Sequence, residues 1–200
     1  MEALVGQAVS IGSKLKAFTA AHHDKIEQHA LTRAIVEGTI TRESYVLLLS
    51  KFYGFYAACE PPLEQTTFWQ QAGFDIKNRR KTPSLRQDLQ FFNIDPASLP
   101  MCTDLPPLQT DAQRLGFLYV VEGATLGGQV LSRALATKFG FTARQGAAYF
   151  NSYGVENIGA MWKQVQALLT DFASKHLELE SELLQAALLT FQKLDTWLNA

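Results

Sequence analysis

This chain of 200 residues lacks the sequence features that mark several classes of protein. It has only two cysteines, Cys59 and Cys102, which lie far apart and form no C-x-x-C pair, so neither a disulfide framework nor a zinc site is expected. It has no apolar run long enough to suggest a membrane span. Residues 1–6 show no basic start followed by an apolar stretch. We therefore expect no signal peptide and a cytoplasmic protein with reduced thiols.

The chain also lacks an excess of charge of one sign. The formal net charge is −1, so no nucleic-acid-binding surface is expected. The run Asn78-Arg79-Arg80-Lys81 is the local exception and a candidate docking patch. Two patterns are missing as well: alternating β-branched runs between turns, and the G-x-G-x-x-G motif. Their absence argues against a sheet protein and against a flavin or nucleotide site of that kind.

The sequence does contain helical periodicity along most of its length. The expected helices span residues 11–37, 41 to about 60, 83–92, 111–139, 157–175 and 177–198. Gly38 should end the first helix, Pro61-Pro62 should interrupt the second, and the last two could be partly continuous. Residues 94–107 contain four prolines and are expected to form a loop, while residues 140–154 have no clear pattern. With 47% hydrophobic residues, the chain is predicted to be one all-α domain over residues 1–200.

Three glycines stand inside the predicted helix at 111–139, and each costs about 1 kcal/mol relative to alanine. Gly123 and Gly127 are four residues apart and share a face, with Gly128 beside them. A face without side chains lets a helix bend and lets its backbone approach a flat ligand. It also allows close packing against another helix. The glycines alone leave both interpretations open.

Only four histidines are present: His22, His23, His29 and His176. A lone histidine is more often a packing or surface residue than a ligand, although a neutral imidazole is a good ligand for haem iron. His23 has Glu27 four residues later on the same helical face, where a carboxylate can orient the ring. The same spacing is compatible with a merely solvated Glu27. His22 has Ile26 at that offset, so His23 is the stronger candidate.

Several stretches in combination resemble the haem oxygenase family, especially its bacterial biliverdin-producing branch. The most specific are residues 119–131 (Tyr-Val-Val-Glu-Gly-Ala-Thr-Leu-Gly-Gly-Gln-Val-Leu), His23-Asp-Lys-Ile-Glu27 and Gly38-Thr-Ile-Thr-Arg42. Residues 51–56, 81–89, 161–163 and 190–198 also match, so the resemblance runs from about residue 14 to the end. It implies an all-α, single-domain haem-oxygenase-like fold, with haem between the first helix and a glycine-kinked distal helix.

The resemblance also implies roles for individual residues. His23 would ligate the iron with Glu27 as its partner, and the face of Gly123, Gly127 and Gly128 would lie over the haem. Further residues match propionate-binding or hydroxyl positions of the family: Lys16, Lys163 and Tyr119. Together the two lysines and the tyrosine would form a basic and polar rim for the anionic edge of the ligand.

The sequence departs from the family at two positions. Ala124 stands where many relatives carry an aspartate that holds water for proton delivery, so water would have to be held by Thr125, Gln129 or backbone carbonyls. Ala167 replaces a second basic partner for the propionates. These changes leave the rate and the position of ring cleavage open.

The resemblance implies that haem is both substrate and cofactor. The ring would be opened with O2 and electrons from a ferredoxin or flavoprotein reductase, giving biliverdin, ferrous iron and CO, and a phytochrome or biliverdin reductase could receive the biliverdin. The absence of C-x-x-C-H excludes the usual covalent haem attachment. One alternative is a non-catalytic haem carrier or sensor, which Ala124 keeps open. Another is a di-iron enzyme, but such a site needs several carboxylates on facing helices and the 111–139 helix offers Glu122 with no histidine.

Overall fold

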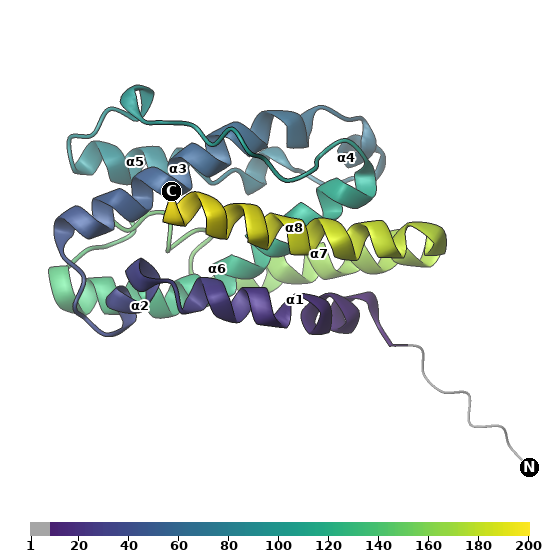
Figure 1. Ribbon diagram of the computed structural model, residues 1–200, viewed down its shortest axis with the longest axis horizontal. Helices are drawn as coiled ribbons and strands as arrows, with labels where there is room; N and C mark the ends of the chain where they lie inside the picture. Colours follow the sequence, from purple (N-terminus) through teal and green to yellow (C-terminus); the bar gives the residue numbers. More distant parts are fainter. Residues whose placement is uncertain (1–8) are drawn as a thin grey trace, which may run out of the picture.

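The computed structural model describes residues 9–200, and most of these residues are helical (Figure 1). Residues 1–6, on which the expectation about a signal peptide depends, lie outside this part. Eight α-helices and three short 3-10 turns follow one another in residues 9–200: α1 Ile11–Glu27, α2 Ala30–Val36, α3 Arg42–Glu64, α4 Phe68–Gln71, η1 Lys77–Arg79, α5 Thr82–Phe91, η2 Pro96–Ser98, α6 Asp111–Phe139, α7 Val155–Lys175, η3 Leu177–Leu179 and α8 Glu180–Asn199. No described helix is long and apolar enough to cross a membrane.

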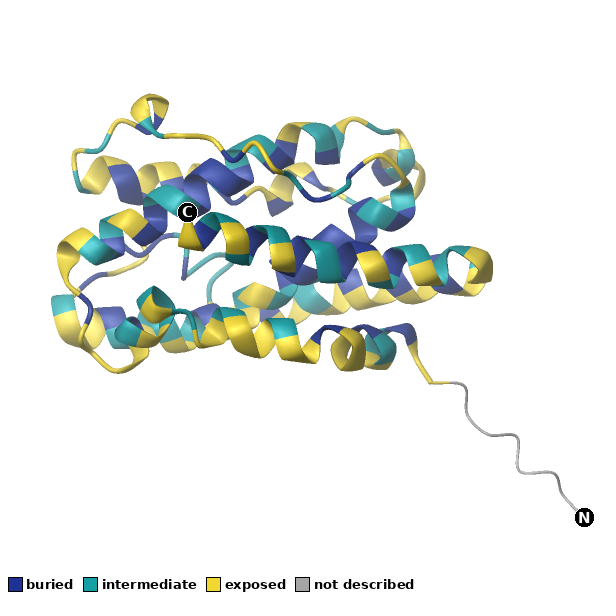
Figure 2. Cartoon of the chain, in the orientation of Figure 1, coloured by how far each residue is buried: buried dark blue, intermediate teal, exposed yellow. Residues whose placement is uncertain are grey.

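The last helix, α8, packs against both α6 and α1 and organises the interior. Gly116 on α6 makes the close approach possible, because a Cβ there would lie 2.6 Å from the Leu183 carbonyl oxygen and 2.7 Å from the Ala187 nitrogen. Buried side chains gather on the inward faces of these helices (Figure 2). In α1, however, only Ile11, Leu15 and Thr19 are buried. The second half of α1 is therefore less buried than the first, and Ile26 is its partly buried contact with the core.

The helix boundaries follow from capping. Ser10 accepts a hydrogen bond from the Ser13 amide at the start of α1, and Thr41 does the same for Ser44 in α3. Thr110 and Gln113 form a reciprocal capping box at the start of α6. Gly140 ends α6 with φ of 71°, a left-handed conformation that glycine adopts readily. The observed α6 coincides with the predicted helix at 111–139.

The predicted helix at 11–37 is wrong in its middle, since the chain breaks at Gln28 and His29. The His29 Nδ1 accepts a hydrogen bond of 3.3 Å from the Leu31 amide, so this histidine caps α2. The chain then leaves α2 through Gly38, as predicted, with φ of 68°.

Two further boundaries differ from the sequence-based expectation. Pro61 and Pro62 do not interrupt α3, which continues to Glu64. Each proline lacks the amide hydrogen of a helical bond, but both stand within the last turn, where the loss of continuity is small. The last two predicted helices, α7 and α8, are separate and are joined through His176 and η3. The short α4 was not predicted.

Candidate functional site

A cavity of about 1030 Å³ lies between α1 and α2 on one side and α6 on the other, and is completed by α3, α7, α8 and the segment before α7. Most of its lining is apolar, with a few polar groups from α1 and α6. This volume is at the upper end of the roughly 300–1,000 Å³ typical of small-molecule and cofactor sites. The lining includes most of the predicted site residues: Lys16, His23, Glu27, Tyr119, Gly123, Thr125, Gly127 and Gly128.

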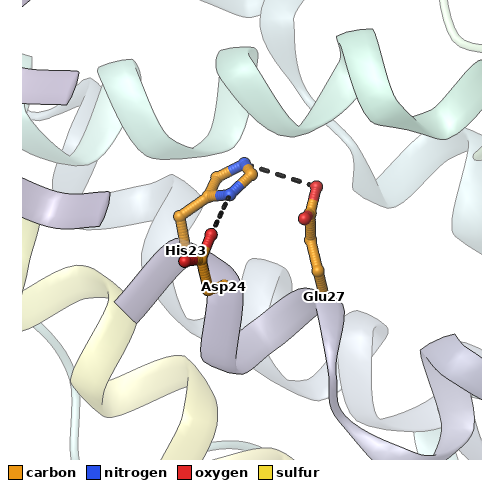
Figure 3. A group of neighbouring side chains, drawn as sticks. All are labelled: His23, Asp24 and Glu27. Carbon is orange, nitrogen blue, oxygen red and sulfur yellow. Dashed lines mark ion pairs between the residues drawn. The ribbon is translucent and has the colours of Figure 1, made fainter. Parts of the chain in front are cut away.

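His23 lies on the α1 wall and is the one histidine among the described residues that line the cavity. Figure 3 shows its ring between two carboxylates of the same helix. His23 Nε2 is 3.7 Å from Glu27 Oε1 and Nδ1 is 3.9 Å from Asp24 Oδ1, both beyond hydrogen-bond distance. About half of the His23 side chain is exposed, so both ring nitrogens are free to take new partners. His22 points elsewhere, with its Nε2 2.9 Å from Gln192 Nε2.

The glycines of α6 form the opposite wall. A Cβ on Gly127 would meet no atom within 4 Å, and one on Gly123 would meet only the Trp162 ring at 3.8 Å. Neither glycine therefore packs closely against another helix. Gly128 differs, because its Cβ would lie 3.2 Å from the Phe150 carbonyl oxygen. Of the two interpretations left open by the sequence, this geometry favours a bare face over the cavity for Gly123 and Gly127.

The residues expected to hold water differ in whether they line the cavity and in what hydrogen-bonding groups they offer there. The Thr125 Oγ1 donates its hydrogen to the Glu122 carbonyl oxygen over 2.6 Å, so this hydroxyl keeps only acceptor capacity. Ala124 lines the cavity and brings no polar group. Gln129 is half-buried and is not part of the lining.

The predicted polar rim is only partly assembled. Lys16 is exposed at the cavity and forms no ion pair among the described residues. Burial raises the pKa of the Tyr119 hydroxyl, with hydrogen bonding to Thr19 acting in the opposite direction, so Tyr119 remains a neutral donor. Its ring packs against Trp162, with centroids 5.8 Å apart. Lys163 is exposed on α7 and does not line the cavity.

One part of the cavity wall was not predicted from the sequence. Tyr56 from α3 and Tyr149 from the segment before α7 both line the cavity, and their hydroxyl oxygens lie 3.0 Å apart. Burial raises the pKa of both hydroxyls. The periodicity of α3 could have identified Tyr56 as inward-facing. Tyr149 lies in residues 140–154, where the sequence showed no pattern, so no signal pointed to it.

The predicted docking patch at residues 78–81 is wrong, because two of its cations are buried behind the glycine face. Arg79 Nη1 lies 2.7 Å from Glu122 Oε2, and Lys81 Nζ lies 2.6 Å from Glu122 Oε1. Tyr153 donates to the same Glu122 oxygen over 2.8 Å. Burial lowers the pKa of Lys81, and the attraction of Glu122 opposes this effect. Arg79 and Lys81 thus neutralise a buried carboxylate on α6, and of this run only Asn78 and Arg80 stay exposed, with Arg80 paired to Glu64.

The di-iron alternative finds no support in residues 9–200. Such a site requires carboxylates from facing helices. The group of three possible metal ligands that these residues bring together is His23, Asp24 and Glu27, all on α1 and all exposed. This group belongs to one wall of the cavity already described.

Comparison with known proteins places the chain in a family. The heme oxygenase family model matches residues 9–200. The heme oxygenase of Xanthomonas campestris pv. campestris (strain 8004) is 32% identical over 145 residues, covering 70% of this chain and 79% of that protein.

Solved structures give the same fold at lower identity. The NO- and CO-bound heme oxygenase from Neisseria meningitidis aligns with a TM-score of 0.80 and 22% identity over 96% of this chain and 92% of that one. Heme oxygenase-1 of the cyanobacterium Synechocystis, in complex with heme, gives 0.73 and 17% over 96% and 91%. The chain therefore belongs to the heme oxygenase family and has the all-α heme oxygenase fold.

Proposed function

We propose that this protein binds haem in the cavity between α1 and α6 and cleaves it, with O2 and supplied electrons, to biliverdin, ferrous iron and CO. The observation that carries the proposal is the pairing of two walls across one cavity. His23 is the histidine on the α1 wall, and Gly127 on the α6 wall has no atom within 4 Å of a would-be Cβ. A planar iron porphyrin needs such a ligand on one face and free space on the other.

The α1 wall would bind and orient the substrate. One His23 ring nitrogen would ligate the iron, and a carboxylate of Glu27 or Asp24 would accept the hydrogen of the other nitrogen. This second contact fixes the tautomer and raises the basicity of the ligand. Lys16 stands at the rim without an ion-pair partner in residues 9–200 and would bind a propionate. Lys163 is proposed as a second propionate partner, which requires its exposed side chain to reach around the rim from α7.

When bound, haem supplies the iron that activates O2 against its own porphyrin ring. The α6 wall would contribute space and oriented water. Gly123 and Gly127 leave room next to the porphyrin face, and Thr125 can accept a hydrogen bond from water while its own hydrogen is held by Glu122. Tyr119 can donate. Gln129 remains a proposed helper, although it would have to turn toward the cavity. These neutral groups would replace the carboxylate that Ala124 lacks.

The reaction also needs electrons from outside the chain. We propose a ferredoxin or flavoprotein reductase as donor, with a phytochrome or a biliverdin reductase as recipient of the product. The cytoplasm is the proposed location, with residues 1–200 working as one domain. The single hydrophobic core that residues 9–200 share supports the proposal of one domain.

A haem carrier or sensor is the second candidate, favoured by Ala124 alone. The two functions separate when haem is titrated anaerobically and reductant and O2 are then added. Cleavage is expected to replace the Soret band with the broad red absorption of biliverdin and to release CO. A carrier would instead return to ferric haem with the porphyrin intact, and this result would overturn the proposal.

A further inference from the structure

Helices α1, α6 and α8 run in the same direction along the cavity, and α2 follows α1 at one end of it (Figure 1). Ion pairs from Lys14 to Glu180 and from Lys25 to Asp195 fix the direction of α1 relative to α8. Helix α8 packs against α6 as well. A position on α1 can therefore be matched to a position on α6 through α8.

His23 lies near the middle of the cavity. Its ring packs against Phe191 of α8, with centroids 6.0 Å apart. Gly116 of α6 lies against Ala187, about one turn earlier on α8. Because the helices run in parallel, His23 is within about one turn of the level of Gly123 on α6. The lining can therefore be followed from this level toward either end.

Toward the start of α1 the lining is polar. Lys16 stands seven residues before His23, about 10 Å along the helix. It lines the cavity together with Ser13 of α1 and with Gln166 and Thr170 of α7. Among the described residues, Lys16 is the one lysine or arginine in the lining. A ligand with carboxylates on one edge should therefore turn that edge toward this end.

Toward α2 the lining becomes aliphatic. Leu126 and Val130 share one face of α6, and Val36 of α2 lines the same cavity. We call these three residues the aliphatic end. Val130 stands seven residues after Gly123, about 10 Å further along α6. The three residues are 43%, 55% and 56% exposed, so the described chain leaves much of their surface uncovered. In residues 9–200, neither α2 nor α6 contributes a charged side chain to the lining.

A ligand anchored at the polar end directs its opposite edge toward the aliphatic end. In haem, the edge opposite the propionates carries only methyl and vinyl groups, which are short. Some natural haems carry a long isoprenoid tail there in place of one vinyl group. Such a tail can cover aliphatic surface that the short groups do not reach, and burial of apolar surface favours binding.

We propose that the cavity binds haems with an isoprenoid tail on the edge opposite the propionates, and that the aliphatic end holds the tail between α2 and α6. The inference rests on haem binding as proposed above and adds a ligand class to it. His23 and Lys16 hold the iron and a propionate as they would for haem itself. Gly127 leaves room along the path of the tail, because a Cβ there would meet no atom within 4 Å.

The test compares haem with haem o, in which a hydroxyethylfarnesyl group replaces one vinyl group. Each ferric haem is titrated into the full-length apo protein from the same carrier solution, and binding is followed by the Soret band. Val36→Asp and Val130→Asp place a carboxylate in the aliphatic end. Val155→Asp is the matched control, because Val155 is 63% exposed and does not line the cavity. Thermal melts of the apo variants establish that they fold.

The wild type should bind haem o about tenfold more tightly than haem, the effect of burying about two methylene groups. Val36→Asp and Val130→Asp should each remove most of this preference, whereas Val155→Asp should keep it. Equal affinities for the two haems in the wild type would overturn the inference. A preference that survives in both cavity variants, or that falls equally in the control, would overturn it as well.

The same titrations distinguish this inference from the proposed function. A wild type that binds haem but excludes haem o would overturn the tail site and leave haem cleavage standing. Failure to bind either haem would overturn both. A wild type that shows the expected preference for haem o, but returns intact ferric haem after reductant and O2 are added, would support the ligand class and overturn the proposed cleavage.

Discussion

His22 and His23 are neighbours in sequence, but only His23 lines the cavity. Successive residues point about 100° apart on a helix, so a shift of one position turns a side chain away from the site. The Glu27 spacing selected, from sequence, the histidine that lines the cavity, because a carboxylate four residues later lies on the same face. The sequence could not show that Asp24 also approaches the ring, since residues one apart do not share a face. That contact depends on side-chain rotamers.

At this scale, we predict that His23→Ala removes the ordinary haem ligand while His22→Ala retains it. Loss of an iron ligand should weaken haem binding by at least about tenfold, the lower end of the loss seen for partners of metal ligands. Absorption spectra of the haem complexes, with affinity from titration, provide the measurement. If His22→Ala loses the histidine-ligated spectrum and His23→Ala keeps it, the assignment is wrong.

Asp88 is the buried carboxylate that fixes residues 148 and 149 through two backbone amides. Burial raises the pKa of Asp88 from 3.8 to about 6 and outweighs those amide hydrogen bonds, which act in the opposite direction. The folded state therefore binds this proton more tightly than the unfolded state does. Its contribution is present at low pH and is lost as the pH rises through about 4 to 6.

We predict that the free energy of unfolding of the wild type, relative to Asp88→Asn, falls by about 2 kcal/mol between pH 4 and pH 6. Urea unfolding at several pH values measures this difference, since other titrating groups largely cancel. Asp171→Asn, at an exposed position paired with Lys175, is the control and should run parallel to the wild type. Parallel profiles for Asp88→Asn as well would show that Asp88 does not titrate in this window.

At the scale of elements, α6 contains glycines of two kinds. Gly116 meets the backbone of α8, whereas Gly127 meets nothing. The sequence predicted the bounds of α6 because its cap residues and hydrophobic periodicity are local. It could not distinguish the two kinds of glycine, since the difference depends on which element lies opposite. For the same reason, neither the break at Gln28 nor the continuation of α3 past Pro61 could be predicted from local sequence pattern.

This contrast predicts opposite effects of one substitution at two positions. Gly127→Ala should stabilise the apo protein by up to about 1 kcal/mol through better helix propensity. Gly116→Ala should destabilise it by roughly 1–3 kcal/mol, because the new methyl would overlap atoms at 2.6–2.8 Å. Apo thermal melts compare the two.

Haem affinity provides a second test of the bare-face interpretation of Gly127. Replacing Gly127 with leucine should weaken haem binding or O2 access while the apo fold survives, since the added side chain would enter the cavity. An unstable apo protein with normal haem affinity would contradict the bare-face interpretation and favour helix packing.

At the scale of the whole molecule, α6 separates two different environments. One side is bare and lines the cavity, and the other carries Glu122, buried between Arg79 and Lys81. Arg79 also binds the Met161 carbonyl oxygen and Gln164, so it ties α6 to α7. The sequence indicated the all-helical class and the two helices, α1 and α6, that form the facing walls of the cavity. It misplaced the basic run at residues 78–81, because burial of charges depends on a carboxylate more than forty positions away.

The central claim is that this cavity supports haem cleavage although Ala124 offers no carboxylate to hold water. The most direct measurement is the product formed from haem, a reductase system and O2 by the wild type and by Ala124→Asp, identified by chromatography of the pigment and by CO release. We expect biliverdin and CO from the wild type, at a rate that Ala124→Asp changes but does not create. A wild type that returns intact ferric haem, beside an Ala124→Asp variant that makes biliverdin, would contradict the account and favour a haem carrier or sensor.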